Sequence, residues 1–333
     1  MSRNTGDNQN RNASDNEPMS SVLDTFLSRR TVVRGGLGAA IAMIAGTGLT
    51  GCFDSGGGSS GDDTPAPTPT PTPEPTPDPV KKLALGFTSI PGSRTDAVTV
   101  AAGYTAYVLA PWGTPLNSTA KAWKNDGTNT SVDQANSMGM HHDGMHFFPI
   151  NGSSTDGLIA INFEYIDEVA LHPAGPTKVN GVRPAEEVRK EINAHGAGVV
   201  RVRKAGDRWQ VVDNDPLNRR FTTASVMNLS GPLKGTDHVK TKFSTDGSRT
   251  RGTNNNCGNG YTPWGTYLTC EENWPGIFVN KGTRPADQVR IGVATTAGNY
   301  EWETAAGDAT EVNDEFGRFN ITPRGAAATD DYR

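Results

Sequence analysis

The segment GLIAINFEYI, residues Gly157–Ile166, is the strongest indicator of the fold. Its nearly continuous apolar run, rich in β-branched and aromatic side chains, predicts a buried β-strand. Val199–Val212 predicts a β-hairpin, because apolar and polar residues alternate on both sides of a turn at Ala205–Asp207. Three further strands are predicted, at Ala97–Val108, Tyr261–Thr269 and Gln288–Thr296.

One helix is predicted, over Pro184–Ala194. A proline suits the first helical turn, Glu186 and Glu187 follow it, and Gly196 ends the segment. Many short strands separated by turn residues, with little helix, indicate an all-β class: a sandwich, barrel or propeller. The chain shows no clean repeat of about 40–50 residues, so the period alone does not select a propeller.

The bulk composition excludes several classes of protein. The 333 residues suffice for one large domain or two ordinary ones, and the net charge is −5. No block of lysine and arginine lies beyond the leader, so nucleic acid is not expected as a partner. Three cysteines are too few for a disulfide scaffold. The sequence lacks the P-loop, GxGxxG, GxSxG and HExxH motifs, which excludes nucleotide-cradle, Rossmann, α/β-hydrolase and zincin interpretations.

The N-terminal region resembles an export signal. Arg29 and Arg30 form a twin-arginine pair, and the weakly apolar Gly35–Thr50 that follows is shorter than the roughly 20 residues of a spanning helix. Leu49–Cys52 resembles the lipobox of bacterial lipoproteins, in which Cys52 would be acylated. The alternative is a plain twin-arginine signal with an unmodified cysteine. We expect export to the periplasm, the outer membrane or the cell surface, with membrane contact only through a lipid at Cys52.

A proline-rich tether follows the signal. Thr64–Pro79 has proline at nearly every second position, which prevents helix and sheet pairing and favours polyproline II. We therefore divide the chain into a disordered signal region at 1–52, a Gly/Ser- and Thr/Pro-rich linker at 53–80, and a folded region at 81–333. The polar end of the chain supplies no closing strand, so we expect a piece of a longer protein.

The segment TNNNCGNGYTPWGTYLTCEEN, residues Thr253–Asn273, holds the most distinctive candidate site. Cys257 lies among asparagine and glycine residues that favour a tight turn. Three interpretations are open: a small buried apolar residue, a disulfide with Cys270, or a thiolate ligand of a transition metal.

Glu271 and Glu272 follow the predicted strand Trp264–Cys270. Adjacent side chains on a strand point to opposite faces, so both can share one site only if the strand ends or bulges there. The alternative is a solvated acidic turn. A cysteine combined with carboxylates suits iron with calcium better than zinc alone.

A second group of candidates lies upstream. His141–His146 reads HHDGMH and contains His142 and Asp143, which could contact a metal or substrate or form a structural turn. Glu164 lies within the predicted apolar strand, where an unpaired charge is very costly. Its partner would be a metal or an arginine of the Arg219–Arg220 pair, which also suits bidentate phosphate recognition.

These segments together resemble the PhoX family of secreted bacterial alkaline phosphatases. The resemblance is carried by the twin-arginine leader, HHDGMHFFP at 141–149, GLIAINFEYID at 157–167, Asn218–Arg220, Asn255–Cys257 and TPWGTYLTCEEN at 262–273. It implies a β-propeller that acts as a monomeric, calcium-dependent phosphomonoesterase with an iron–calcium cluster.

The resemblance also assigns roles to the candidate residues. Cys257 becomes a ligand of iron as Fe³⁺, and Glu271 and Glu272 become bridging or calcium-binding carboxylates. Glu164, His142 and Asp143 line the same centre, while Arg219 and Arg220 are candidates for substrate binding. A metal-bound oxo group, hydroxide or water would attack phosphorus, so no side chain is assigned as the catalytic nucleophile.

Members of the family are longer than this chain, so the cluster is expected to be incomplete. The chain alone is expected to be inactive or poorly folded unless a second piece completes it. Two other functions stay open. One is a phosphodiesterase that uses the same cluster, and the other is a non-catalytic surface lipoprotein whose β-domain binds a partner.

Overall fold

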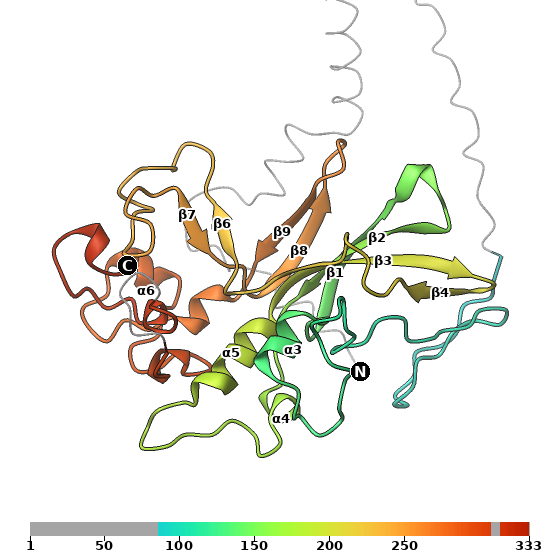
Figure 1. Ribbon diagram of the computed structural model, residues 1–333, viewed down its shortest axis with the longest axis horizontal. Helices are drawn as coiled ribbons and strands as arrows, with labels where there is room; N and C mark the ends of the chain where they lie inside the picture. The colour runs from blue at the N-terminus through green and yellow to red at the C-terminus, as the bar shows by residue number, and fades with distance from the viewer. Residues whose placement is uncertain (1–85, 308–313, 333) are drawn as a thin grey trace, which may run out of the picture. The chain divides into compact units, whose positions relative to one another are not determined.

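The computed structural model describes residues 86–307 and 314–332 (Figure 1). Contacts divide the chain between Leu83 and Ala84, and all described residues belong to the second unit. The predicted signal region, Cys52 and the proline-rich linker lie outside the described residues. Within the described part of the chain, no helix has both the length and the apolar character needed to cross a membrane.

An antiparallel sheet of five strands forms the centre of this unit. Its strands are β1 (His142–Pro149), β2 (Asp156–Phe163), β3 (Gly196–Ala205), β4 (Arg208–Val211) and β5 (Arg219–Phe221). The order is β1-β2-β3-β4, and β5 also pairs with β3. The predicted buried strand is therefore confirmed as β2, and the predicted hairpin is confirmed as β3 and β4.

Two smaller sheets are antiparallel hairpins. The first pairs β6 (Val226–Asn228) with β7 (Arg249–Arg251), and the second pairs β8 (Asn256–Tyr261) with β9 (Tyr267–Glu271). Strand β8 packs against β1 and β2. The fold of the described residues is mostly strands with few helices. Among these residues the three sheets are separate, and no closed barrel or propeller is formed.

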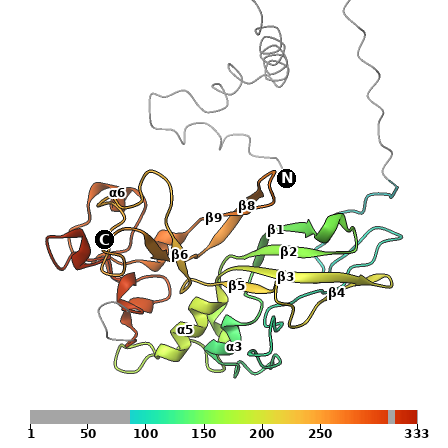
Figure 2. The ribbon, with the colours of Figure 1, turned by 45° about the horizontal axis from the view of Figure 1, so that its top comes forward.

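The helices of the described residues are short. They are α3 (Ser131–Ala135), α4 (Glu168–Leu171), α5 (Ala185–Ala194) and α6 (Ala286–Arg290). Helix α6 lies near the C-terminus, away from the main sheet (Figure 1). Single turns of 3₁₀-helix occur at Ile150–Gly152, Trp274–Ile277, Trp302–Thr304, Gly317–Phe319 and Ala328–Asp330. In Figure 2, α3 and α5 lie next to β5. The predicted helix is confirmed as α5, with Pro184 as its N-cap and Gly196, at φ 107°, two residues after its last residue.

Two predicted strands are wrong. Ala97–Val108 forms no strand, and its valines Val98 and Val108 are 83% and 78% exposed, because no neighbouring strand pairs with them. Gln288–Thr296 was expected to be a strand because its apolar residues alternate. Its first residues instead belong to α6, which begins after Pro285 and carries Asp287 in its first turn, where both residue types favour a helix.

The predicted strand Tyr261–Thr269 is a hairpin turn with parts of two strands. Strand β8 ends at Tyr261 and β9 begins at Tyr267. Between them Thr262 N donates to Thr266 O at 2.9 Å, and Gly265 takes the left-handed region at φ 81°. Proline and glycine in this turn cannot continue a strand ladder, so the chain reverses here.

Two apolar clusters hold these elements together. One packs α5 against the C-terminal segments through Leu171, Val188, Ile192, Trp302 and Phe319. The other covers one face of the main sheet with Leu116, Met138, Ile161, Phe163 and Val200. Burial of each such side chain contributes roughly 1.5–3 kcal/mol, so the two clusters fix the ends of the strands that carry the candidate site.

Candidate metal centre

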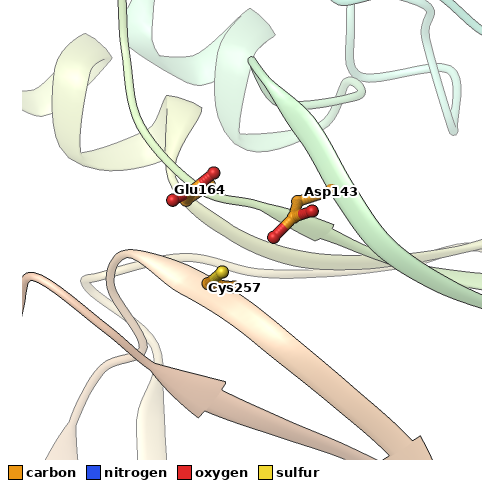
Figure 3. Close-up of side chains that lie close together, drawn as sticks. All are labelled: Asp143, Glu164 and Cys257. Carbon is orange, nitrogen blue, oxygen red and sulfur yellow. The ribbon is translucent and has the colours of Figure 1, made fainter. Parts of the chain in front are cut away.

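Three potential metal ligands from separate parts of the chain lie close together. The side chains of Asp143, Glu164 and Cys257 face a common point (Figure 3). One ligand atom from each lies within 4.8 Å of the other two, and all three residues are half-buried. Asp143 belongs to β1, Glu164 directly follows β2, and Cys257 belongs to β8. Cys257 therefore lies 93 positions after Glu164 and 114 positions after Asp143 along the chain.

Asp143 lies in an irregular part of β1. The register between β1 and β2 shifts between His142 and Met145. A bulge of this kind redirects a side chain out of the regular alternation. Gly144 permits the close approach of β8, because a Cβ atom there would lie 2.5 Å from Asn259 Oδ1. The bulge and the glycine together bring Asp143 next to β8.

Glu164 was expected inside an apolar strand, but β2 ends one residue before it. Its backbone is held on both sides: Glu164 N donates to His141 O at 3.1 Å, and His195 Nδ1 hydrogen-bonds with Glu164 O at 3.0 Å. The pKa of the Glu164 carboxyl is raised, first by desolvation and then by the negative charges of Asp143 and Glu272. The strand end thus gives Glu164 room to face other carboxylates.

Cys257 also lies where a ladder is irregular. The register between β8 and β9 shifts between Asn256 and Asn259. Hydrogen bonds to Glu272 and then to Asp143 raise the pKa of the Cys257 thiol to about 12, with a further contribution from desolvation. A bound cation would reverse this preference, because thiolates rather than thiols ligate metals.

The alternative of a disulfide between Cys257 and Cys270 is wrong. Both cysteines are free thiols. Cys257 is half-buried against the carboxylates, whereas Cys270 is exposed on β9.

The two consecutive glutamates separate. Glu272 follows the end of β9 and hydrogen-bonds with the Cys257 thiol. Glu271 instead accepts hydrogen bonds from Thr253 Oγ1 and Asn254 N, both at 2.8 Å. It also lines a separate cavity of about 340 Å³. Glu272 thus acts on the donor cluster of Asp143, Glu164 and Cys257, whereas Glu271 stabilises the loop that precedes β8.

His142 is not brought into the close donor set. Its Nε2 atom hydrogen-bonds with Gly139 O at 3.1 Å, and its ring lies 5.2 Å from the Phe163 ring. Desolvation lowers the pKa of His142. The neighbouring His141 stacks on Tyr165 at 3.6 Å.

The arginine pair has a different environment from the one expected of a phosphate fork. Arg220 donates from Nη1 to Ala197 O at 2.9 Å and from Nη2 to His195 O at 3.1 Å, and it stacks 4.3 Å from the Phe163 ring. Burial lowers the pKa of Arg220 to about 9. Arg219 is exposed on β5.

The arginine partner considered for Glu164 is not found. In the part of the chain that the structure describes, no lysine or arginine forms an ion pair with Asp143, Glu164 or Glu272. The negative donors therefore lack a cationic side chain to balance them, which is unfavourable for partly desolvated charges unless a cation binds.

One residue that sequence reasoning missed is Asn162. It lies within the apolar run of β2, is fully buried, and its Nδ2 atom donates to Cys257 O at 2.7 Å. An amide inside a buried strand must be hydrogen-bonded. This requirement is the signal in the sequence that could have identified Asn162.

A second group of possible ligands, His172, Glu187 and Glu191, is also close enough to hold an ion. Here the charges are balanced by the protein. Glu191 is fully buried and accepts hydrogen bonds from Arg183, from His172 Nε2 at 2.7 Å and from Trp302 Nε1 at 2.7 Å. We therefore regard this group as a structural ion-pair network.

A strand-rich domain that brings a thiol and several carboxylates to one point has the donor set of a metal-binding protein. Residues 85–329 match the family described as alkaline phosphatase PhoX, and the chain belongs to this family. It is also similar to the structure of Pseudomonas fluorescens PhoX in complex with vanadate, a transition-state analogue, with 34% identity and a TM-score of 0.64. That match covers 71% of this chain but 39% of the other. A search of curated proteins found no match.

Proposed function

We propose that this chain carries the cysteine-containing side of a metal centre that hydrolyses phosphate monoesters. The observation that carries the proposal is the convergence of Asp143, Glu164 and Cys257 within 4.8 Å. Membership of the PhoX family supports a phosphatase function, and the similar protein was solved with an analogue of a phosphoryl-transfer transition state.

The residues present fit a site for iron and calcium. Cys257 supplies a soft sulfur donor, which iron accepts, and the three carboxylates supply the hard oxygen donors that calcium prefers. Desolvation, followed by the nearby carboxylates of Asp143 and Glu272, raises the pKa of Glu164, and hydrogen bonds to Glu272 and Asp143 raise the pKa of Cys257. Both directions support a site rich in carboxylates. Bound cations would neutralise charge on the phosphate oxygens in the transition state.

The protein's own part in this function is to bind and orient. The carboxylates of Glu272 and Asp143 both act on the Cys257 thiol and can accept its proton or share a cation with it. Glu164 is fixed through its backbone rather than its carboxylate, which leaves both carboxylate oxygens available as donors. Four donors cannot fill several coordination spheres, because calcium alone takes six to eight oxygen ligands, some of them water. We infer that further donors complete the centre.

We also propose, from the family resemblance, that the separate antiparallel sheets are blades of a β-propeller. The antiparallel hairpins β6–β7 and β8–β9 support this, since propeller blades are small antiparallel sheets. Export through the twin-arginine signal, with lipidation at Cys52, is proposed from the sequence.

Metal analysis of two matched variants tests the centre. The purified full chain is loaded with iron and calcium, desalted and analysed by mass spectrometry. We expect Cys257→Ser to lose bound iron and Cys270→Ser, on the neighbouring strand, to retain it. Equal iron in the two variants would contradict the proposal. Assaying the loaded protein with one monoester and one diester substrate then distinguishes the monoesterase from a diesterase.

A further inference from the structure

Asn162 makes an unusual set of contacts for a residue in a buried strand. It is the seventh residue of β2 and has no exposed surface. Its Nδ2 atom donates to Cys257 O at 2.7 Å, and to the following carbonyl, that of Gly258, at 3.4 Å. Its Oδ1 atom accepts from Thr269 Oγ1 at 2.8 Å and from Tyr267 OH at 3.0 Å. The amide therefore joins β2 to both strands of the β8–β9 hairpin.

The Cys257 carbonyl needs this contact because the β8–β9 ladder is irregular there. Regular pairing stops at Asn256 and resumes at Asn259, so the carbonyl of Cys257 is not placed by a matched pair of residues. A partly buried backbone carbonyl without a hydrogen-bond partner is unfavourable. The side chain of Asn162 takes over the role that the neighbouring strand plays elsewhere.

Asn162 is also connected to the chain segments that carry Asp143 and Glu164. The single proton of the Tyr267 hydroxyl is shared between Asn162 Oδ1 at 3.0 Å and Gly144 O at 2.8 Å, and Gly144 is the residue next to Asp143. Asn162 itself lies two residues before Glu164. The Asn162 amide is thus hydrogen-bonded to the Cys257 carbonyl, connected through Tyr267 to the backbone beside Asp143, and close in sequence to Glu164.

A further hydrogen bond fixes the orientation of the Asn162 amide. Asn256 Nδ2 donates to Thr269 Oγ1 at 2.9 Å, so the Thr269 hydroxyl proton is free to point at Asn162 Oδ1. With the oxygen of Asn162 assigned to the hydroxyls, its nitrogen must face the Cys257 carbonyl. The network therefore admits one orientation of the amide.

We propose that Asn162 is a positioning residue for the metal centre, which sets the main chain of Cys257 relative to Asp143 and Glu164. This inference rests on the proposed metal site. Residues behind metal ligands typically contribute about 10–100-fold to metal affinity. Asn162 acts through the backbone of the ligand, so its effect is separate from any charge that it could supply.

The test uses Co²⁺ as the probe, because its thiolate charge-transfer absorption reports bonding to sulfur. It is titrated into metal-free full chain with Cys52 and Cys270 replaced by serine, so that Cys257 is the only thiol. In this background, Asn162→Asp keeps the shape and the acceptor oxygen, removes the donor to Cys257 and adds a carboxylate. Added negative charge alone would favour Co²⁺, so a loss of affinity reports the lost donor. We expect its Co²⁺ affinity to fall by about 10–100-fold, with a weaker thiolate band.

Asn280→Asp is the matched control. Asn280 is also fully buried and donates from Nδ2, at 2.7 Å to Gln288 Oε1, but it has no contact with the donor cluster. We expect this variant to lose stability in urea yet keep its Co²⁺ affinity. Unchanged Co²⁺ affinity and band in folded Asn162→Asp would overturn the inference.

Thr269→Val keeps the test decisive if Asn162→Asp does not fold. This substitution preserves the shape and removes only the hydroxyl that orients the amide. We expect a smaller but measurable loss of Co²⁺ affinity, and an affinity equal to that of the Asn280→Asp control would again overturn the inference. Loss of the band in Cys257→Ser tests the proposed centre by itself: if that band persists, the centre is refuted, whatever Asn162 does.

Discussion

The fully buried Glu191 provides the sharpest test of how charges are distributed in this fold. It lies on α5 and accepts hydrogen bonds from Arg183, His172 and Trp302. Replacement by glutamine keeps the size of the side chain and removes its charge. If the network is structural, Glu191→Gln should destabilise the protein and leave metal binding unchanged.

The expected magnitude follows from the contacts. Removing one partner of a buried ion pair costs about 3–5 kcal/mol, because the remaining charge is left buried. Arg183 is 3% exposed but keeps two other carboxylates, Glu168 at 3.2 Å and Glu187 at 3.5 Å. The lower end of the range, about 3 kcal/mol, is therefore expected. For a domain of this size it corresponds to a decrease of about 1 M in the urea midpoint.

The assay is urea unfolding of metal-free protein, followed by tryptophan fluorescence. Asp207→Asn, in the exposed turn between β3 and β4, is the control and should change the free energy of unfolding by less than about 1 kcal/mol. Two results would refute the reasoning. One is a loss below 1 kcal/mol in Glu191→Gln, and the other is a bound metal ion that the wild type holds and this variant loses.

Two further predictions concern the donor cluster and a turn. Glu164→Gln should lower Co²⁺ affinity at least tenfold. Glu271→Gln should keep the Co²⁺ affinity and lose about 1 kcal/mol of stability, since Glu271 is hydrogen-bonded to the loop before β8. Equal Co²⁺ titration curves for the two variants would contradict this. Gly196→Ala should lower the free energy of unfolding by about 3 kcal/mol, because its Cβ would lie 2.0 Å from Phe221 O at φ 107°. Gly206→Ala, with open space at φ 61°, should lose only about 1 kcal/mol in the same urea experiment.

Local signals in the sequence predicted the elements whose residues agree with their environment. The hairpin at Val199–Val212 combines alternation with a glycine turn, and the helix combines proline, acidic residues and a final glycine. Ala97–Val108 has strand-forming residues but no partner strand, which only the tertiary structure reveals. In TPWGT, at 262–266, the aromatic and β-branched residues outweighed a turn signal from Pro263 and Gly265, and the hairpin was missed for that reason.

The candidate site was predictable as a set of residue types but not as an arrangement. Cys257 and Asp143 stand out by composition, yet their proximity depends on the packing of β8 against β1 and β2. Nothing in the sequence indicates which of Glu271 and Glu272 turns toward the thiol. The end of β9 at Glu271 decides this, because the strand alternation stops there.

The positions of the three converging donors and of Glu272 share one physical feature: each lies where a β-ladder is interrupted. Asp143 and Cys257 occupy register shifts, and Glu164 and Glu272 follow strand ends. A regular strand would send neighbouring side chains to opposite faces and would satisfy its backbone without help. At the interruptions, side chains such as Asn162 hold the backbone instead, and like charges come together without a cationic side chain from the described residues. Such an arrangement is unfavourable for the apo fold, so cation binding is the interaction that can compensate for it.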